Sequence, residues 1–229
     1  MTGNKIALVT GANRGIGREV ARQLAQDHAM TVYVGSRDLQ KGEAVAAGIG
    51  RTARAIQLDV ADQASVDAAF ARIKAEHGQL DVLINNAGVD YDTDQNASTA
   101  DMARVRRIFD TNLFGAWMVA IAAVPLIREQ GGTIVNVSSM SGALSDMAGG
   151  EAGYGVSKAA LNALTLKLAD ELRRDNIIVN AVCPGWVNTD MGGGGRPVPE
   201  GAKGVVWAAM LGDGAPTGGF FRDGREIGW

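Results

Sequence analysis

Tyr154 and Lys158 are four residues apart, so in a helix their side chains would share one face. A phenol ordinarily has a pKa of about 10, so proton exchange near neutral pH requires a fall of about 3 units, or about 4 kcal/mol in favour of the phenolate. The neighbouring Lys158 ammonium would supply part of that stabilisation. Ser139, farther upstream, can donate a hydrogen bond to a carbonyl oxygen that gains negative charge. Together these side chains predict proton transfer at a polarised carbonyl group.

A glycine-rich turn near the start of the chain indicates phosphate binding. Gly11, Gly15 and Gly17 follow the apolar run Lys5–Thr10 with the spacing G-x-x-x-G-x-G. Glycines at these points let the backbone turn tightly and approach a pyrophosphate, and the helix that follows points free N–H groups at it. The spacing differs from the common G-x-G-x-x-G fingerprint, and a glycine-rich turn without a ligand is the alternative interpretation.

A basic residue after the second apolar run bears on which dinucleotide would bind. Arg37 lies 20 residues after Gly17, where an acidic residue would hold an adenosine ribose and a basic residue would pair with a 2′-phosphate. Together with Arg14 in the glycine turn, Arg37 favours NADP over NAD. The neighbouring Asp38 favours the opposite choice, and a solvated surface charge is the alternative for Arg37.

Short apolar runs alternate with amphipathic stretches, and these elements must position the residues above. The predicted strands are Lys5–Thr10, Thr31–Gly35, Ala53–Leu58, Asp81–Asn85, Thr133–Val137, Ile177–Val182 and Gly219–Phe221. The predicted helices are Gly15–Asp27, Asp38–Ala47, Asp62–His77, Ala100–Ile127 with a break near Pro125, Ala152–Arg174 and Gly201–Leu211. Continuous apolar strands between helices predict one parallel sheet with helices on both faces, the doubly wound α/β (Rossmann) fold, with residues 1–229 as a single domain.

Further signatures occur in order along the chain, at the ends of predicted strands or inside helices. They are Asn85-Asn86-Ala87-Gly88, Asn112, Ser138-Ser139, Tyr154-x-x-x-Lys158 and Pro184-Gly185. Each motif is weak alone, but their joint order is specific. The chain from Lys5 to about Phe221 resembles the short-chain dehydrogenase/reductase family, and within it the NADPH-dependent carbonyl reductases.

The resemblance implies reversible reduction of an aldehyde or ketone, with NADP(H) as cofactor and a small carbonyl or alcohol compound as substrate. It assigns polarisation of the carbonyl to Ser139 and acid–base catalysis to Tyr154. It assigns lowering of the Tyr154 pKa and ribose binding to Lys158, and a bound water to Asn112. Ser138 competes with Ser139, although the family pattern favours the second serine. A buried structural amide is the alternative for Asn112.

The residues expected to contact the cofactor lie in the glycine turn, in the loops after several strands and in the catalytic helix. They are Gly11, Asn13, Arg14, Gly15, Ile16, Gly17, Arg37, Asp59, Val60, Asn86, Ala87, Gly88, Tyr154, Lys158, Pro184, Gly185, Trp186, Val187 and Thr189. For Asp59, a strand-end cap is the alternative.

Two loops are expected to border the substrate. Together with the catalytic pair they would contribute Ser139, Met140, Leu144, Met147, Tyr154, Trp186 and Met191. Few residues separate Thr189 from the last helix, and Met191–Gly195 is rich in glycine, so we expect a short mobile lid and a tolerant pocket. For the methionines, packing in the core is the alternative.

Composition excludes several other classes of protein. With 22 basic and 25 acidic residues the formal net charge is −3, which excludes a nucleic-acid binder that relies on a basic surface. The single cysteine, Cys183, excludes an intrachain disulfide framework and a cysteine-based zinc site. The pattern of His, Cys, Asp and Glu predicts no metal site.

The chain ends and the longest apolar stretch bear on location and assembly. The polar start Met1–Lys5 is not typical of a signal peptide, and the uncharged stretch Leu113–Ile127 is shorter than the roughly 20 residues that a bilayer requires, so a cytoplasmic protein without membrane association is expected. The long insertion that monomeric carbonyl reductases often carry before the tyrosine is absent, so a homodimer or homotetramer is expected. The tail Arg222–Trp229 would pack on a partner subunit or close the pocket.

Two other functions remain open at this point. One is an NAD-dependent alcohol dehydrogenase of the same family, which would work mainly toward the ketone. The other is a non-enzymatic regulator that senses dinucleotides, although such a protein typically loses the proton-transfer residues that this chain retains.

Overall fold

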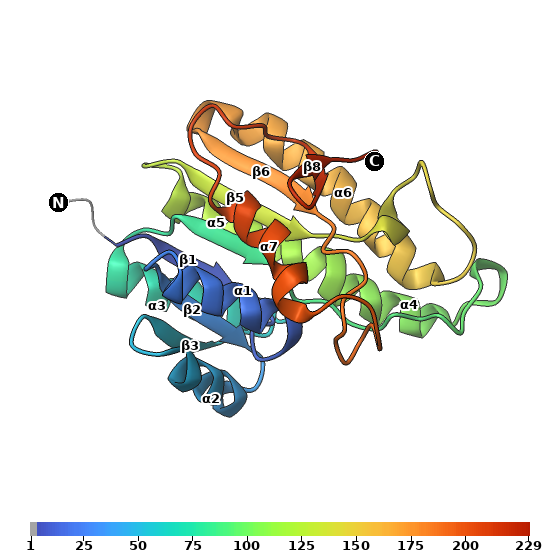
Figure 1. Ribbon diagram of the computed structural model, residues 1–229, viewed down its shortest axis with the longest axis horizontal. Coiled ribbons are helices and arrows are strands. Elements are labelled where there is room, and N and C mark those ends of the chain that lie inside the picture. The colour runs from blue at the N-terminus through green and yellow to red at the C-terminus, as the bar shows by residue number, and fades with distance from the viewer. Residues whose placement is uncertain (1–3) are drawn as a thin grey trace.

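Strands form where the apolar runs predict them, and they assemble into one eight-stranded sheet. The computed structural model describes residues 4–229, so the first three residues of the polar start lie outside the described residues. The order in the sheet is β3-β2-β1-β4-β5-β6-β7-β8, and neighbours pair in parallel except that β8 is antiparallel to β7 (Figure 1). The strands are β1 (Ile6–Val9), β2 (Thr31–Ser36), β3 (Ala53–Gln57), β4 (Val82–Asn85), β5 (Gly132–Val137), β6 (Ile177–Val182), β7 (Phe220–Arg222) and β8 (Arg225–Glu226).

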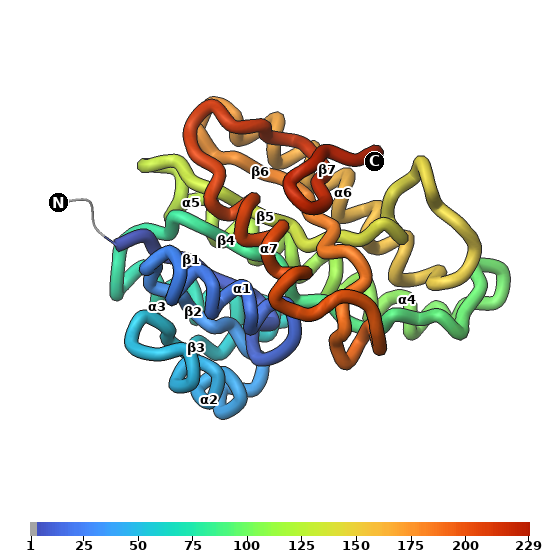
Figure 2. The backbone as a smooth tube through the Cα atoms, in the orientation of Figure 1, coloured from blue at the N-terminus to red at the C-terminus, as the bar shows by residue number. Residues whose placement is uncertain are grey.

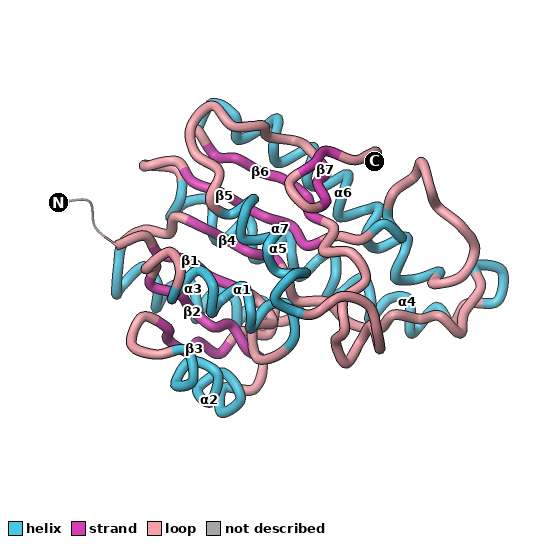
Figure 3. The backbone as a smooth tube through the Cα atoms, in the orientation of Figure 1, coloured by secondary structure: helices cyan, strands magenta, loops and turns pink. Residues whose placement is uncertain are grey.

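Helices cover both faces of this sheet (Figure 3). One face packs against α1 (Gly15–Gln26), α2 (Leu39–Ile49) and α7 (Val198–Ala209), and the other against α3 (Gln63–His77), α5 (Ala116–Ile127) and α6 (Ala152–Leu172). Successive strand residues enter opposite cores: Ile134 of β5 packs on the α3, α5 and α6 side, and Val135 on the α1, α2 and α7 side. The predicted doubly wound α/β sheet is confirmed.

The strand order reverses at the centre of the sheet, where β1 lies between β2 and β4. In such sheets a crevice forms outside the carboxyl ends of the strands at the point of reversal. The loops after β1, β4, β5 and β6 all leave from these ends, and their paths can be followed in Figure 2. They carry the glycine turn, the Asn-Asn-Ala-Gly motif, the serine pair and the Pro-Gly motif.

The predicted long helix is irregular at a different place than expected. After α4 (Met102–Phe109) a π-helical turn, Asp110–Gly115, leads into α5, and the helix then continues through Pro125 without the predicted break. Pro125 is exposed, so the carbonyl that it leaves without a partner can be hydrated. The π turn contains Asn112, and such turns are frequent at functional sites.

The same long helix bears on the membrane question. By length and composition alone, the 26 residues Met102–Ile127 could cross a bilayer. Leu113–Ile127, the stretch judged too short for a membrane span from the sequence, is shorter than the apolar helix that the structure forms. Half of the most apolar window is buried inside the fold, and a helix packed on a sheet passes the same test. The absence of membrane association stays a prediction.

The C-terminal part also departs from expectation. α7 begins at Val198 rather than Gly201, with Pro199 in its first turn, where proline is well accepted. β8 was not predicted. It follows a two-residue turn in which Asp223 and Gly224 have φ values of +52° and +74°, as a type I′ hairpin turn requires.

Candidate active site

The glycine turn after β1 is joined to the loop after β4 through Thr10. The Thr10 hydroxyl accepts hydrogen bonds from the backbone N–H groups of Asn86 (3.0 Å) and Ala87 (2.9 Å). In return, the Asn86 side chain donates to the carbonyls of Thr10 (2.9 Å) and Gly11 (3.2 Å). Gly11 has a φ of +63°, and a Cβ there would lie 2.9 Å from the Ala87 Cα, so only glycine fits. Sequence reasoning missed Thr10, although it directly precedes the glycine motif.

The helix that follows presents an anion-binding end. α1 begins at Gly15, which has a φ of +53°, and within the described chain no side chain caps its first turn. A Cβ at Gly17 would clash with the Asn86 amide, so this glycine permits the close approach of the two loops. Asn13 and Ile16 complete the turn. A tight glycine turn and uncapped N–H groups are what a dinucleotide pyrophosphate requires, so these residues fit such a cofactor.

A pocket of about 330 Å³ lies at the carboxyl ends of β2 and β3, where adenosine is predicted. Arg37 lies at this pocket and is exposed, and Asp59 Oδ1 accepts the Ala61 N–H at 3.1 Å, as a strand-end cap would. Val60 is 5% exposed, and its side chain and its carbonyl both lie against Gly115, so its cofactor contact stays a prediction. The pocket lining comprises Arg37, Gln57, Asp59, Asp62, Ser65 and Ala68.

The two arginines predicted to share a phosphate lie in different surroundings. Arg37 lines the adenosine pocket, whereas the Arg14 guanidinium pairs with Asp190, in the loop after β6, at 3.0 Å. Both side chains of this pair are largely exposed, and an exposed ion pair contributes little stability. Of the two arginines, Arg37 lies at the predicted adenosine pocket and Arg14 does not line it.

α6 carries Tyr154 and Lys158 toward the end of β5. Burial raises the pKa of the Tyr154 phenol, and the neighbouring Ser139 hydroxyl opposes this effect by lowering the same pKa. Lys158 is 4% exposed, and its Nζ lies 5.6 Å from the centre of the Tyr154 ring and donates to the Val137 carbonyl at 2.8 Å. Burial lowers the pKa of Lys158 to about 8. The structure thus brings the three side chains together, while the lowering of the Tyr154 pKa by Lys158 stays a prediction.

The two adjacent serines are used differently. Ser138 is 2% exposed and donates to Asn162 Oδ1 at 2.6 Å, so its hydroxyl is engaged in the core. Ser139 is partly exposed and precedes the short 3-10 turn Met140–Gly142, where its Oγ accepts the Ser141 N–H at 3.2 Å. The geometry therefore favours Ser139 as the hydroxyl available to a substrate.

Asn112 is a buried amide in the π turn, and its partners link three parts of the site. Its Oδ1 accepts the Val89 N–H at 2.9 Å, and its Nδ2 donates to the Val89 carbonyl (3.3 Å) and to Ser157 Oγ (3.1 Å). A Cβ at Gly88 would lie 3.6 Å from Asn112 Oδ1 and 3.8 Å from Lys158 Nζ. The amide therefore has a structural task, and it also lies close to the lysine.

The Pro-Gly loop after β6 rests on an arginine that sequence reasoning missed. Gly185 has a φ of +76°, and a Cβ there would lie 3.1–3.2 Å from the Arg196 guanidinium. Arg196 Nε donates to the Pro184 carbonyl at 2.9 Å, and its Nη1 pairs with Asp223 of the β7–β8 turn at 2.7 Å. Val187 is buried beside this anchor. The sequence carries no local signal for it, because Arg196 follows a run of glycines and lies far from Asp223 in the chain.

The loop that follows Pro184-Gly185 folds back on itself. The Trp186 indole donates to the Gly192 carbonyl at 3.1 Å, and Thr189 Oγ1 accepts the Gly192 N–H at 3.1 Å. The Thr189 methyl lies 3.4 Å from the place where a Gly15 Cβ would be. Thr189 therefore lies beside the glycine turn, while its contact with the cofactor and the mobility of Met191–Gly195 stay predictions.

Most side chains predicted to border the substrate are exposed, namely Leu144 (71%), Trp186 (67%), Met147 (40%) and Met191 (37%). Met140 instead packs with Trp229 against the buried cluster around Phe220, as the alternative for the methionines anticipated. Sequence reasoning missed Tyr91, whose ring meets the Tyr154 ring edge to face with centroids 4.9 Å apart. Tyr91 follows the Asn-Asn-Ala-Gly motif by only a few residues, which is the signal that could have identified it.

The C-terminal tail packs within the chain. Trp229 stacks on Phe220 with ring centroids 5.4 Å apart, and its carbonyl accepts the Ser145 N–H at 2.9 Å. The tail thereby holds the loop that follows Ser139. Whether Arg222–Trp229 also contacts a partner subunit or closes the pocket stays a prediction.

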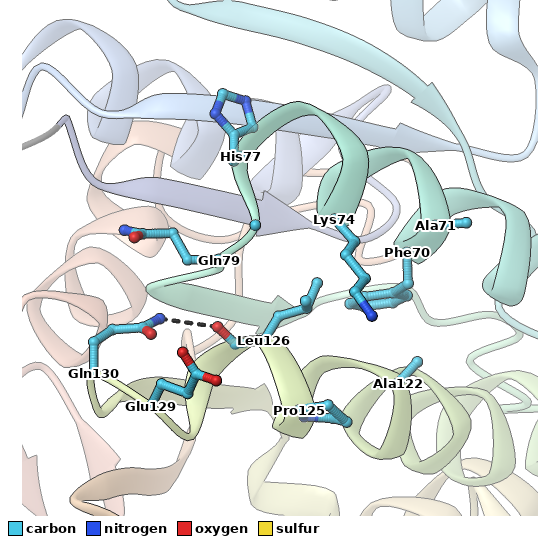
Figure 4. A pocket seen from close by; sticks show the side chains of 11 residues that line it. Phe70, Ala71, Lys74, His77, Gln79, Ala122, Pro125, Leu126, Glu129 and Gln130 are labelled. Carbon is cyan, nitrogen blue, oxygen red and sulfur yellow. Dashed lines mark hydrogen bonds between the residues drawn. The ribbon is translucent and has the colours of Figure 1, made fainter.

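A larger pocket, of about 480 Å³, lies between α3 and α5 (Figure 4). Phe70, Lys74, Leu126 and Glu129 are among its walls, and Gln130 donates there to the Leu126 carbonyl at 2.9 Å. The predicted site residues, all within the described chain, line other parts of the molecule. Size alone therefore does not identify the functional site.

Comparisons with known proteins agree with this geometry. A family model described as short chain dehydrogenase matches residues 5–197. Oxidoreductase UcpA of Salmonella typhimurium is 41% identical over 193 residues, which cover 82% of this chain and 71% of UcpA. Carbonyl reductase 1 (NADPH) of Sus scrofa is 33% identical over 275 residues, with 98% of this chain and 94% of the relative covered. The NADPH-bound carbonyl reductase from chicken fatty liver superposes with a TM-score of 0.87 at 27% identity, over 99% of both chains.

Proposed function

Because the chain belongs to the short-chain dehydrogenase family, we propose that it reduces aldehydes or ketones to alcohols, reversibly, with NADPH. The observation that carries the proposal is the placement of the Ser139 and Tyr154 hydroxyl groups beside each other, with Lys158 Nζ 5.6 Å from the centre of the Tyr154 ring. Two donors that converge suit a carbonyl oxygen that acquires negative charge. The pair lies at the carboxyl ends of the strands, as the glycine turn does.

Each side chain has a distinct task in the proposed reduction. When bound, NADPH supplies the hydride that reaches the carbonyl carbon. The Ser139 hydroxyl donates to the carbonyl oxygen, and the Tyr154 phenol gives that oxygen a proton. Burial raises the pKa of Tyr154 and so opposes release of the proton, an effect that the Ser139 hydroxyl and the Lys158 ammonium are proposed to offset. The Lys158 ammonium then stabilises the phenolate that remains.

Asn112 and Lys158 are proposed to share a water molecule that connects the site to solvent. In support, both Asn112 Oδ1 and Lys158 Nζ lie within about 4 Å of one point, the place where a Gly88 Cβ would be. A water molecule can bridge two polar groups that lie near the same point. The water would return a proton to the site after each turnover.

The preference for NADPH over NADH rests on Arg37 at the adenosine pocket. The neighbouring Asp38, which favoured NAD in the sequence, has a structural task instead: its carboxylate caps α2 by accepting the Lys41 N–H at 3.3 Å. A guanidinium free to bind a 2′-phosphate and a carboxylate already engaged both favour NADPH. An NAD-dependent alcohol dehydrogenase is therefore the second choice.

The location and the assembly of the protein are the subject of a separate proposal. We propose a cytoplasmic homodimer or homotetramer that acts on a small carbonyl or alcohol compound, without nucleic acid or membrane. In support, Phe114, Trp117 and Ile121 are 48%, 43% and 62% exposed and recur at helical spacing. An apolar stripe on a long helix suits contact with a second copy of the chain.

The test is oxidation of NADPH and NADH by the purified protein against a panel of aldehydes, diketones, quinones and cyclic ketones. Turnover with NADPH and little with NADH is the expected result. Faster turnover with NADH would favour the NAD-dependent alternative. Tight cofactor binding without turnover on any compound would contradict the reductase proposal and favour the dinucleotide-sensing regulator.

A further inference from the structure

Asp92 is a buried carboxylate to which the sequence motifs give no task. It lies in the loop after β4, next to Tyr91, and is 0% exposed. Its Oδ2 accepts the Gly153 N–H at 2.8 Å, and its Oδ1 accepts the Tyr154 N–H at 3.0 Å. We propose that Asp92 is a positioning residue that fixes the start of α6, and with it the phenol of Tyr154, for proton transfer.

The start of α6 lacks the cap that a helix usually supplies from its own N-cap residue. Glu151 occupies that position with a φ of +49°, and its side chain accepts the Ser141 hydroxyl at 2.6 Å instead of capping the helix. The first N–H groups of a helix need acceptors, and a carboxylate at that end is also favoured by the helix dipole. Asp92 supplies both the acceptor oxygens and the negative charge, from a loop about 60 residues away in the chain.

The fit around Asp92 leaves little freedom. A Cβ at Gly153 would lie 3.0 Å from Asp92 Oδ2 and 2.8 Å from the Ile108 Cδ1. A larger residue at position 153 would therefore push the carboxylate away from the helix. Glycine at this point permits the close approach of loop and helix.

The same loop also restrains the backbone of Tyr154 at its carbonyl. The Tyr154 carbonyl accepts the Ser157 hydroxyl at 2.7 Å, and Ser157 Oγ accepts the Asn112 amide, which is bonded to Val89. Val89 and Asp92 are three residues apart in the loop. The backbone of Tyr154 is thus tied to one short segment through its N–H and through its carbonyl. The Tyr91 ring, edge to face with the phenol ring, adds a third restraint from that segment.

Neighbouring acids in this loop behave differently. Asp90 and Asp94 both pair with Arg104, at the surface of α4. Within residues 4–229 the Asp92 carboxylate forms no ion pair, and the hydrogen bonds that it accepts come from two backbone N–H groups of α6. Its burial is therefore explained by the helix start rather than by a salt bridge.

The test compares Asp92→Asn with Asp94→Asn, which changes the same residue type two positions away at the exposed edge of the loop. Two quantities are measured: hydrogen exchange of the Gly153 and Tyr154 amides by NMR, and NADPH-dependent reduction of the best substrate from the carbonyl panel. In D92N one oxygen acceptor becomes an N–H donor. We expect exchange of these two amides to accelerate by about 10-fold or more and kcat to fall by about 10- to 100-fold. KM and the Kd for NADPH should stay within about threefold, and D94N should match the unaltered protein.

A merely structural role would alter thermal stability without this split between kcat and KM. Equal kcat in D92N and D94N, or unchanged exchange of the two amides, would overturn the proposal. Should D92N fail to fold, Asp92→Ser keeps an oxygen acceptor in a smaller side chain and is judged by the same two measurements. The catalytic part rests on the proposed reductase function. Absence of turnover in the unaltered protein would count against that function, while amide exchange would still decide whether Asp92 holds Tyr154.

Discussion

The catalytic floor and the substrate rim of this molecule are held in opposite ways. The floor comprises Asn112, Ser139, Tyr154 and Lys158, and the rim comprises Leu144, Met147, Trp186 and Met191. Floor residues lie on α6, in a π turn and directly after β5, and each is fastened by hydrogen bonds. Rim side chains lie on loops and keep from 37% to 71% of their surface exposed. The difference shows that the proposed catalytic side chains are held by the packed fold, while the side chains proposed to border the substrate have few restraints.

Among the floor and rim variants, the largest loss of activity is expected when the phenol hydroxyl of Tyr154 is removed. Tyr154→Phe should lower kcat by about 10²- to 10⁴-fold, because it removes the proposed proton donor to the carbonyl oxygen. NADPH binding should be nearly unchanged. Tyr91→Phe, which removes a hydroxyl from the adjacent ring, is the matched control and should stay within about fivefold of the unaltered protein. Equal activity in Y154F and the unaltered protein would rule out the proposed mechanism.

Lys158→Met separates the chemistry of the floor from its stability. Loss of the ammonium should raise the pKa of the Tyr154 phenolate and lower turnover by about 10- to 1,000-fold. The surface variant Lys167→Met, on the same helix, should leave turnover unchanged. Steady-state kinetics with the best panel substrate measures both. Similar kcat values in K158M and K167M would mean that the ammonium has no catalytic task.

The variant Lys158→Met should also have a higher free energy of unfolding than the unaltered protein, by an amount that depends on pH. Burial lowers the pKa of Lys158 to about 8, so below that pH the folded state must hold a charge that the unfolded chain holds more easily. The cost of keeping the buried ammonium charged in the folded state is roughly 3 kcal/mol. K158M removes this cost but also loses the hydrogen bond to the Val137 carbonyl, so we expect it to be about 1–2 kcal/mol more stable at pH 7. The unfolded chain binds more protons between pH 8 and about 10.5, so the unaltered protein gains stability there and the advantage of K158M shrinks. Urea unfolding at about pH 7 and about pH 9.5 tests this, and an advantage that grows with pH would contradict it.

Arg37→Asp tests the predicted adenosine pocket at the ends of β2 and β3, which belongs to neither the floor nor the rim. Loss of a charge-assisted pair should weaken NADPH binding by about 10- to 100-fold and NADH binding by less than about twofold. Arg51→Asp, also an exposed arginine near β3, is the control and should change neither. Titration calorimetry with both dinucleotides gives the four affinities. Equal weakening for both dinucleotides would remove the argument for a 2′-phosphate contact.

The rim should respond least. Leu144→Ala should change KM for bulky ketones by about two- to fivefold and leave kcat for a small aldehyde within about twofold, because the side chain is 71% exposed. Steady-state kinetics on two substrates of different size provides the measurement. A loss of kcat comparable to that of a floor residue would show that floor and rim are not separate.

Much of the fold was predictable because its signals are local. Apolar runs such as Ile177–Val182 can be buried only as central strands between two helical layers, so the strand positions and the doubly wound arrangement follow from the pattern. The π turn at Asp110–Gly115 was not predictable, since its propensities match those of an ordinary helix. The β7–β8 hairpin could have been expected from its Asp-Gly turn.

The motif residues followed from the order of short patterns in the chain: the glycine turn, Ser139, Tyr154 and Lys158. Spacing within one helix or one turn is a local property, so the sequence determines it without knowledge of distant contacts. Tertiary structure alone decided the rest. It buries the competing serine, Ser138, against Asn162, and it brings the hydrogen-bond partners that hold these residues from remote parts of the chain. Asp92 at the start of α6 and Arg196 beneath Gly185 carry no local signal, because a cap or an anchor supplied across the fold depends on where two loops meet in space.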